Sequence, residues 1–310
     1  MKPFRFGVNV RGAESRADWA EKARAVEALG FSTLLIPDHL VDLMPPLVSL
    51  VSAAEATSTL RVGTFVLNND FRHPVLVARE AAAIDLLSEG RLELGIGAGH
   101  MRSEYEEAGI RFDPAPMRIE RLGEAVRIIK SLLAGELASS DGPHYRVRQH
   151  RGYPLPAQKP RPPILIGGNG PRLLTLAARE ADIVGFTGLG FLQGGGAVDV
   201  SGFKAESVDQ RVGLVRSEAG ERFERIELNA LVQRVVVTDD ARSAAAELAE
   251  QWPALSVEDV LESPYLLLGT VDEMVAALRA RRERWGISYV VTHEPFRDAL
   301  ALIVARLAGT

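Results

Sequence analysis

Short apolar runs alternate with amphipathic stretches along almost the whole chain. In the stretch 16–29, Trp19, Ala23 and Val26 recur with helical spacing, and Gly30 follows at the position of a helix C-cap. The apolar runs predict strands at 4–10, 33–36, 60–66, 92–96, 164–166, 182–186, 228–237 and 288–291. The amphipathic stretches predict helices at 16–29, 74–87, 118–133, 172–179, 241–251, 271–285 and 297–307. This alternation is typical of a parallel sheet built from βα units.

The count of elements and one motif separate two folds of this kind. Eight strands and about eight helices, the last of which ends the chain, match a (β/α)8 TIM barrel. The alternative is a doubly wound sheet, whose dinucleotide fingerprint requires a glycine where this chain has His100 after Gly95 and Gly97. We therefore predict an α/β fold, with one TIM-barrel domain over residues 1–310 and loop insertions at about 135–163 and 188–203.

Composition narrows the possible functions. The 310 residues include no cysteine, which excludes disulfides, thiolate nucleophiles and iron–sulfur clusters. A formal net charge of −5 argues against nucleic-acid binding, because no basic excess exists to displace counterions from phosphates. No apolar run approaches the ~18 residues of a membrane span, and the start MKPFRFGVNV lacks the apolar block of a signal peptide. We expect a cytoplasmic protein that binds neither nucleic acid nor membrane.

Polar and glycine residues follow the predicted strands, whose C-terminal ends meet at one face of a TIM barrel. The candidates there are Asp38 and His39 after the second strand, Leu67 and Asn68 after the third, Ala98, Gly99, His100 and Ser103 after the fourth, and Gly167, Gly168, Asn169, Gly170 and Pro171 after the fifth. With His293 after the eighth strand, three of the six histidines fall on this rim. One such histidine is more often a packing residue, but three on one rim favour a site.

The run GGNGPR at 167–172 has two readings. Glycines let backbone amides approach an anion closely, and a helix starting near Pro171 would direct its N–H groups and positive dipole end at it. An ordinary glycine-rich βα turn explains the same residues equally well. The run is not a Walker A loop, because no Gly-Lys-Ser/Thr follows it.

Several catalytic chemistries lack their residues in this chain. His-x-His, His-Glu-x-x-His and Gly-x-Ser-x-Gly are all absent from the sequence, so we expect no metal site and no serine hydrolase elbow. None of the five lysines follows a predicted strand, which argues against a Schiff-base enzyme. Redox chemistry at this rim would therefore depend on a bound cofactor.

One long block carries a resemblance to a known family. The segment FRHPVLVAREAAAIDLLSEGRLELGIGAGHMRSEYEEAGI resembles the luciferase-like monooxygenase superfamily, as do LLIPDHL, PPILIGGNGPRLLTLAAREAD and LLGTVDEMVAAL in the same order. The resemblance implies a TIM barrel that binds FMN or the deazaflavin coenzyme F-420 (F420) at its C-terminal mouth, commonly as a homodimer. It also implies that Ala98, Gly99 and the turn 168–171 hold the cofactor phosphate.

The resemblance also suggests roles for single residues. Many deazaflavin members carry a non-proline cis peptide at the end of the third strand, which would lie near Leu67–Asn68 here. In members with Asp-His after the second strand, the histidine acts on the substrate as acid or base, and Asp38 and His39 match that pair. The sugar-phosphate dehydrogenase branch has a glutamate in its fourth-strand loop, whereas this chain has His100, which argues against glucose-6-phosphate as substrate.

Three functional hypotheses follow. The first is an F420-dependent oxidoreductase that moves hydride between the deazaflavin C5 and a small organic substrate, with His39 as proton partner and Asp38 orienting it. In this hypothesis His100 is the second catalytic candidate, positioned by Glu104. The second hypothesis is an FMN-dependent monooxygenase that uses oxygen and reduced flavin from a separate reductase. The third is a flavin-binding barrel without turnover.

Overall fold

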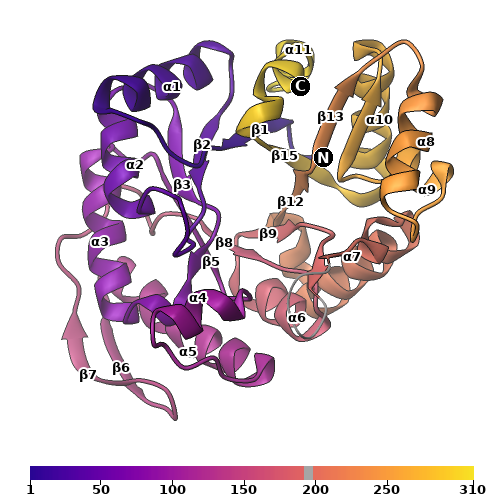
Figure 1. The fold of residues 1–310 in the computed structure, drawn as a ribbon. Coiled ribbons are helices and arrows are strands. Elements are labelled where there is room, and N and C mark those ends of the chain that lie inside the picture. The colour runs from indigo at the N-terminus through magenta and orange to yellow at the C-terminus, as the bar shows by residue number, and fades with distance from the viewer. Residues whose placement is uncertain (192–197) are drawn as a thin grey trace.

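The computed structural model describes residues 1–191 and 198–310 and confirms the (β/α)8 barrel. Eight parallel strands close into a ring inside a layer of helices (Figure 1). Pairing of β1 with β15 and of β3 with β5 completes the ring. In order around it the strands are β1 (Arg5–Asn9), β2 (Thr33–Ile36), β3 (Arg61–Thr64), β5 (Leu92–Gly97), β8 (Ile164–Gly167), β9 (Ile183–Phe186), β12 (Glu227–Val232) and β15 (Ile287–His293).

Alternate residues of each strand point into the barrel, as the two-residue period of a strand requires. The inner set packs into one apolar cluster that includes Leu35, Leu165 and Tyr289, and the outer set packs under the helices. Gly95 lies where β5 approaches β3 most closely, because a Cβ there would lie 2.0 Å from the carbonyl oxygen of Thr64. Only glycine fits at this position without moving the backbone.

The helices begin and end at local sequence signals. Proline at the first position starts α3 (Pro74–Leu87), and a capping box of Thr270 and Glu273 starts α10 (Val271–Trp285), which ends at Gly286 in the left-handed conformation. Both match their predicted bounds, as do two further helices. The remaining helices are α1 (Arg16–Ala28), α2 (Pro46–Glu55), α4 (Arg102–Glu107), α5 (Ala115–Leu133), α6 (Pro171–Glu180), α7 (Ala205–Ala219), α8 (Ala241–Gln251), α9 (Val257–Glu262) and α11 (Arg297–Leu307), with short 3-10 turns η1 (Asn69–Phe71), η2 (Ser201–Phe203), η3 (Gly220–Arg225) and η4 (Glu294–Phe296).

The predicted strand 228–237 is in fact two strands. β12 ends at Val232, and β13 (Arg234–Val237) leaves the barrel to pair in parallel with β14 (Leu266–Gly269). A continuous apolar run does not reveal this change of partner, because the run does not show which strands lie on either side of it. Helices α2, α4, α7 and α9 were not predicted. The sequence of α2 is apolar over most of its length, which hides the helical period.

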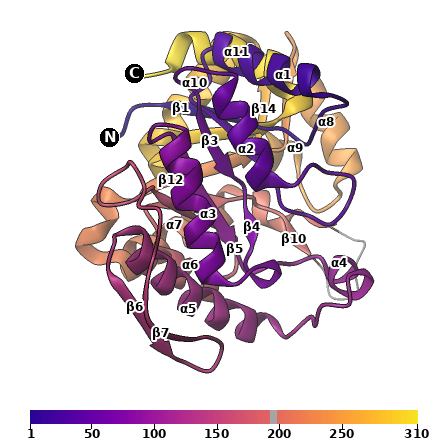
Figure 2. The same cartoon turned by 90° about the vertical axis from the view of Figure 1, so that its left-hand side faces the viewer.

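The two insertions have structure of their own. Residues 135–163 contain the antiparallel hairpin of β6 (Leu137–Asp141) and β7 (Arg146–Arg151), which lies outside α5 (Figure 2). In the second insertion, 188–203, the short strands β10 (Gly190–Phe191) and β11 (Val198–Asp199) pair, and residues 192–197 lie outside the described residues. The two-residue strand β4 (Leu67–Asn68) continues the line of β3 beside β5.

The N-terminal end of the barrel is closed by charged side chains. Arg5 bonds Glu93 at 2.5 Å and Glu227 at 2.6 Å, and Arg61 bonds the same oxygen of Glu93 at 2.7 Å. Although burial opposes it, the charges of Arg5 and Arg61 hold the pKa of Glu93 below its ordinary value. The two chain ends meet nearby (Figure 1), where the Phe4 amide donates to the Thr310 carbonyl at 3.0 Å.

Candidate active site at the barrel mouth

His39 and Glu104 form a hydrogen-bonded pair at the C-terminal end of the barrel. His39 follows β2, and the short helix α4 brings Glu104 to it from the loop after β5. His39 Nδ1 lies 2.5 Å from Glu104 Oε1, and Glu104 Oε2 accepts the Leu40 amide at 2.9 Å. Only 2% of the Glu104 side chain is exposed, against 27% for His39. An ionised carboxylate only accepts, so it places the proton on Nδ1 and leaves Nε2 to exchange protons with a ligand.

His100 lies beside this pair but differs from His39 in its ionisation. The two imidazole rings are 5.1 Å apart and meet edge to face. Partial burial, together with the positive charges of His39 and Arg118, lowers the pKa of His100 to about 4. At neutral pH His100 is therefore uncharged. Glu104, expected to position His100, hydrogen-bonds to His39.

Asp38 does not orient His39. Its buried carboxylate accepts the Asn68 amide at 2.9 Å and pairs with Arg72 at 2.6 Å. The contact draws the segment after β3 against the end of β2. Asp38 therefore holds Arg72 and Asn68 in place at the mouth. The Asp-His sequence at 38–39 does not indicate this role.

The loop after β5 is held by a dense set of hydrogen bonds. Tyr105 Oη donates to Asn68 Oδ1 at 2.9 Å, and burial with the nearby Asp70 charge raises the pKa of Tyr105 above its ordinary value. Arg118 donates to the carbonyls of Ala98 at 3.1 Å and Gly99 at 3.2 Å. Gly99 has φ +73°, and a Cβ there would lie 2.0 Å from Tyr105 Oη. The loop fits only because residue 99 is glycine.

The glycine-rich turn after β8 is only partly available to an anion. The Gly168 amide already donates to the Gly185 carbonyl at 3.0 Å. The Asn169 side chain donates to Thr187 Oγ1 at 2.7 Å and accepts the Gly188 amide at 3.1 Å, which ties this turn to the next one. The part of the turn at Gly170 and Pro171 remains suited to an anion. No side chain caps α6 at Gly170, so the backbone N–H groups of the first helical turn, which begins at Pro171, are left for a ligand.

The cis peptide bond and the remaining candidate residues also lie near the ends of the barrel strands or in the loops that follow them. The non-proline cis bond joins Phe65 and Val66, two residues before the Leu67–Asn68 bond that the resemblance indicated. The Leu67 side chain packs in the outer core, and Gly167 ends β8 inside the rim. Ser103 is exposed on α4. The sequence did not predict a role for Tyr105, Arg72 or Arg118. Each forms hydrogen bonds with residues 19 to 37 positions away, and spacing along the chain does not show such contacts.

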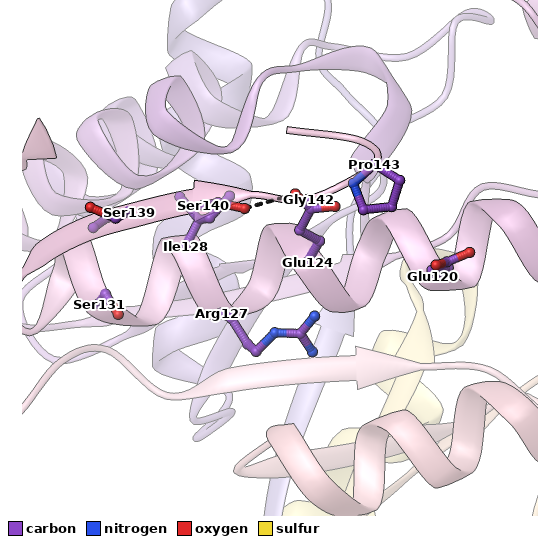
Figure 3. A pocket seen from close by; sticks show the side chains of 10 residues that line it. Glu120, Glu124, Arg127, Ile128, Ser131, Ser139, Ser140, Gly142 and Pro143 are labelled. Atoms are coloured by element: carbon purple, nitrogen blue, oxygen red, sulfur yellow. Dashed lines mark hydrogen bonds between the residues drawn. The ribbon is translucent and has the colours of Figure 1, made fainter. Parts of the chain in front are cut away.

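A hollow of about 300 Å³ lies elsewhere, on the outer wall between α5 and β6 (Figure 3). Its central carboxylate, Glu124, accepts Ser140 Oγ at 2.8 Å and the Tyr145 amide at 3.0 Å, so it fastens the hairpin to α5. None of its lining residues comes from a barrel strand end. The hollow therefore does not replace the mouth as the candidate active site.

Two findings bear on membranes and metals. Over residues 1–191 and 198–310, no helix is both long and apolar enough to cross a membrane. The same part of the chain contains no cluster of three or more His, Cys, Asp or Glu side chains placed to hold a metal ion.

Comparison with known proteins gives matches over most of the chain. A family model described as luciferase-like monooxygenase matches residues 1–286. An F420-dependent glucose-6-phosphate dehydrogenase of Nakamurella multipartita is 29% identical over 96% of this chain and 92% of its own length. A protein of the same name from Microbacterium testaceum is 34% identical, but the match covers 58% of this chain and 55% of that protein.

A solved structure supports the fold in the same way. The coenzyme F420-dependent tetrahydromethanopterin reductase of Methanopyrus kandleri superposes with a TM-score of 0.76. The alignment covers 97% of both chains at 18% sequence identity. At that sequence identity, the likeness supports the barrel fold alone. The chemistry has to be inferred from the residues at the mouth.

Proposed function

Because this chain belongs to the luciferase-like monooxygenase family, we propose that it is an F420-dependent oxidoreductase acting on a small organic substrate in the cytoplasm. The observation that carries the proposal is the pair of His39 and Glu104 at the barrel mouth, joined at 2.5 Å. The names of the relatives support F420 as the cofactor.

The residues of the mouth fit an anionic, ring-bearing cofactor. The uncapped N-terminus of α6, after Gly170, offers backbone N–H groups and a positive dipole end to a phosphate. Ala98 and Gly99 form the neighbouring loop, which Arg118 holds rigid without using any amide of that loop. When bound, the deazaflavin supplies or accepts a hydride at C5.

The chain's own residues handle the proton that accompanies the hydride. Glu104 keeps the proton of His39 on Nδ1, so Nε2 accepts a proton from a substrate hydroxyl or returns one to a carbonyl. The buried carboxylate also stabilises the imidazolium formed in that step. His100, uncharged at neutral pH, supplies a neutral hydrogen-bonding group beside His39. We do not propose glucose-6-phosphate as the substrate, because the resemblance implies a glutamate in this loop of the sugar-phosphate branch, where this chain has Ala98, Gly99 and His100.

Cofactor binding tests the proposal. Purified apoprotein is titrated with F420 and with FMN, following F420 fluorescence and flavin absorbance, and turnover is then screened under air and under argon. We expect micromolar binding of F420 and turnover that does not require oxygen. Binding of FMN without F420, with oxygen-dependent turnover, would overturn the proposal in favour of a monooxygenase served by a separate reductase.

We also propose that the chain forms a homodimer through α3. This helix exposes Leu76, Leu86 and Leu87, the last with 58% of its surface accessible. A second copy packed along α3 would cover these leucines at both ends of the helix and join them into one apolar patch. Light scattering on the purified protein should give twice the chain mass, and a monomer mass would refute the dimer.

A further inference from the structure

Three polar side chains form an arc on the side of the mouth made by β12, β15 and β1. On these strands Leu231, Val291 and Gly7 point into the barrel, so the residues two positions further on, Gln233, His293 and Asn9, point inward at the rim. The register places Asn9 directly opposite His293. His293 Nε2 and Gln233 Oε1 lie 3.2 Å apart, which joins β15 to the end of β12.

Asn9 brings an unsatisfied polar atom into this arc. The residue is only 6% exposed, and its buried Oδ1 has no hydrogen-bond partner within the part of the chain that the structure describes. A buried amide without partners is costly, and in native proteins it calls for a specific explanation. Its Nδ2 group is a donor that can turn toward a ligand oxygen, since the amide can be placed either way round.

Two arginines lie close enough to the arc for their charges to act on the His293 ring. The Arg234 guanidinium lies 5.5 Å from the ring centre of Phe296, just beyond β15, and donates to the Gln233 carbonyl at 2.8 Å. Arg11 follows Asn9 by two residues, and its carbonyl accepts the Met44 amide at 3.2 Å. That bond brings the loop after β2, which contains His39, alongside the end of β1.

The positive charge of these arginines is not neutralised locally. Neither Arg11 nor Arg234 lies within 4.0 Å of a carboxylate oxygen among residues 1–191 and 198–310. Glu294, next to His293 in sequence, pairs with Lys22 at 3.3 Å. Burial and the charges of Arg234 and Arg11 lower the pKa of His293, so its ring is neutral at pH 7 and adds no further cation.

We propose that Arg11 and Arg234, together with Asn9 and His293, bind the anionic group of the substrate. A carboxylate or a phosphate supplies the acceptors that two guanidinium groups and an amide require. Anchoring there leaves the rest of the molecule extending across the mouth toward His39. The substrate is therefore a small organic anion. That this anion is turned over, and not only bound, rests on the proposed function.

The test uses histidine-selective NMR, because six histidines give few signals and the His293 variant His293→Asn assigns the one that matters. The cofactor-free protein is titrated with benzoate, inorganic phosphate and neutral benzamide. We expect a saturable shift of the His293 signal with benzoate or phosphate, and none with benzamide. A response to benzoate alone identifies a carboxylate, and a response to phosphate alone identifies a phosphate group.

Variants complete the test. Arg11→Gln, at an exposed residue, and the double variant with Arg234→Gln should weaken the anion's affinity about tenfold or more, as loss of a charged hydrogen bond does. Arg148→Gln, on the distant strand β7, is the matched control and should leave it unchanged. The inference is overturned if no anion shifts the His293 signal, if benzamide shifts it equally, or if Arg11→Gln has no effect. F420 binding, measured on the same samples, reports on the proposed function separately.

Discussion

The two ends of this barrel differ in how their arginines are paired. At the N-terminal end, Arg5 and Arg61 bond Glu93, and Arg5 also bonds Glu227, so cations and carboxylates are matched. At the mouth, Arg11 and Arg234 have no carboxylate within ion-pair distance in the described chain, and Asn9 has an unsatisfied oxygen. Some groups at the mouth are also paired, as Asp38 is with Arg72, but Arg11 and Arg234 keep a charge that carboxylates neutralise for the arginines at the opposite end. Unpaired cations at the C-terminal face of a barrel are placed where ligands bind.

The largest effect is expected from His39→Ala at the mouth. Removing a general acid–base group costs about 10²- to 10⁴-fold in turnover, whereas cofactor affinity should stay unchanged. The unfolding midpoint should fall, because the buried Glu104 loses a hydrogen-bond partner. Turnover is followed by F420 absorbance with a substrate found in the screen. His150→Ala, at an exposed residue of β7, is the control. Full turnover in both His39→Ala and His100→Ala would refute the assignment of the proton-transfer residue.

Glu93→Gln should have its effect on stability alone. Leaving Arg5 and Arg61 without their shared carboxylate is expected to lower the free energy of unfolding by about 3–5 kcal/mol, as for other broken buried ion pairs. Urea unfolding measures the loss, with the exposed Glu107→Gln as control, which should change stability by less than about 0.5 kcal/mol. A loss under 1 kcal/mol for Glu93→Gln would remove the contrast between the two ends.

Glu104→Gln should reduce activity less than His39→Ala does. The amide keeps the size of the side chain but loses the charge that stabilises the imidazolium. Loss of the carboxylate that orients a metal-bound histidine costs about 10- to 100-fold, and we expect a loss of that size here. We expect kcat to fall with little change in KM, and the pH profile of kcat/KM to move. A variant with the wild-type profile would show that Glu104 only fastens α4 to the rim.

Gly99→Ala tests how tightly the mouth is packed. A Cβ would meet Tyr105 Oη at 2.0 Å, and φ +73° strains any L side chain. The matched control is Gly109→Ala, where φ is +69° and no atom lies within 4 Å of the new Cβ. Gly109→Ala should cost about 1 kcal/mol from backbone strain, and Gly99→Ala about 2–3 kcal/mol. Equal losses would mean that the loop moves aside freely.

The smallest effect is a difference in acid sensitivity. The pKa of His100 is about 4 in the folded chain against 6.5 ordinarily, so between these values the unfolded state binds more protons and stability falls as the pH drops. Because His100 is only partly buried and solvent screens its charge, we expect a loss of less than about 1 kcal/mol, which should be absent in His100→Asn. The Glu93 contribution is lost only below its ordinary value of 4.5. Midpoints of urea unfolding at pH 7, 5.5 and 4 distinguish the contribution of His100 from that of Glu93. If wild type and His100→Asn show the same dependence of the midpoint on pH, the contribution of His100 is refuted.

The sequence determined the barrel, because each βα unit carries its own signals. Periodicity marked the eight barrel strands, and Pro74 and Gly286 lie at the helix ends that they predict. The rim residues could also be located, since polar residues after a strand must lie at its C-terminal end. His39, His100 and His293 were all found in this way.

Only the tertiary structure decided which of those residues act together. Glu104 pairs with His39 across 65 positions, Asp38 turns to Arg72, and the end of β12 departs into a second small sheet. The reason is physical: local pattern depends on a residue's immediate neighbours, whereas a hydrogen bond at the rim depends on how adjacent barrel strands and α4 are placed. The sequence pattern thus predicts which residues lie at the mouth, whereas the packing of the folded chain determines which of them form hydrogen bonds with each other.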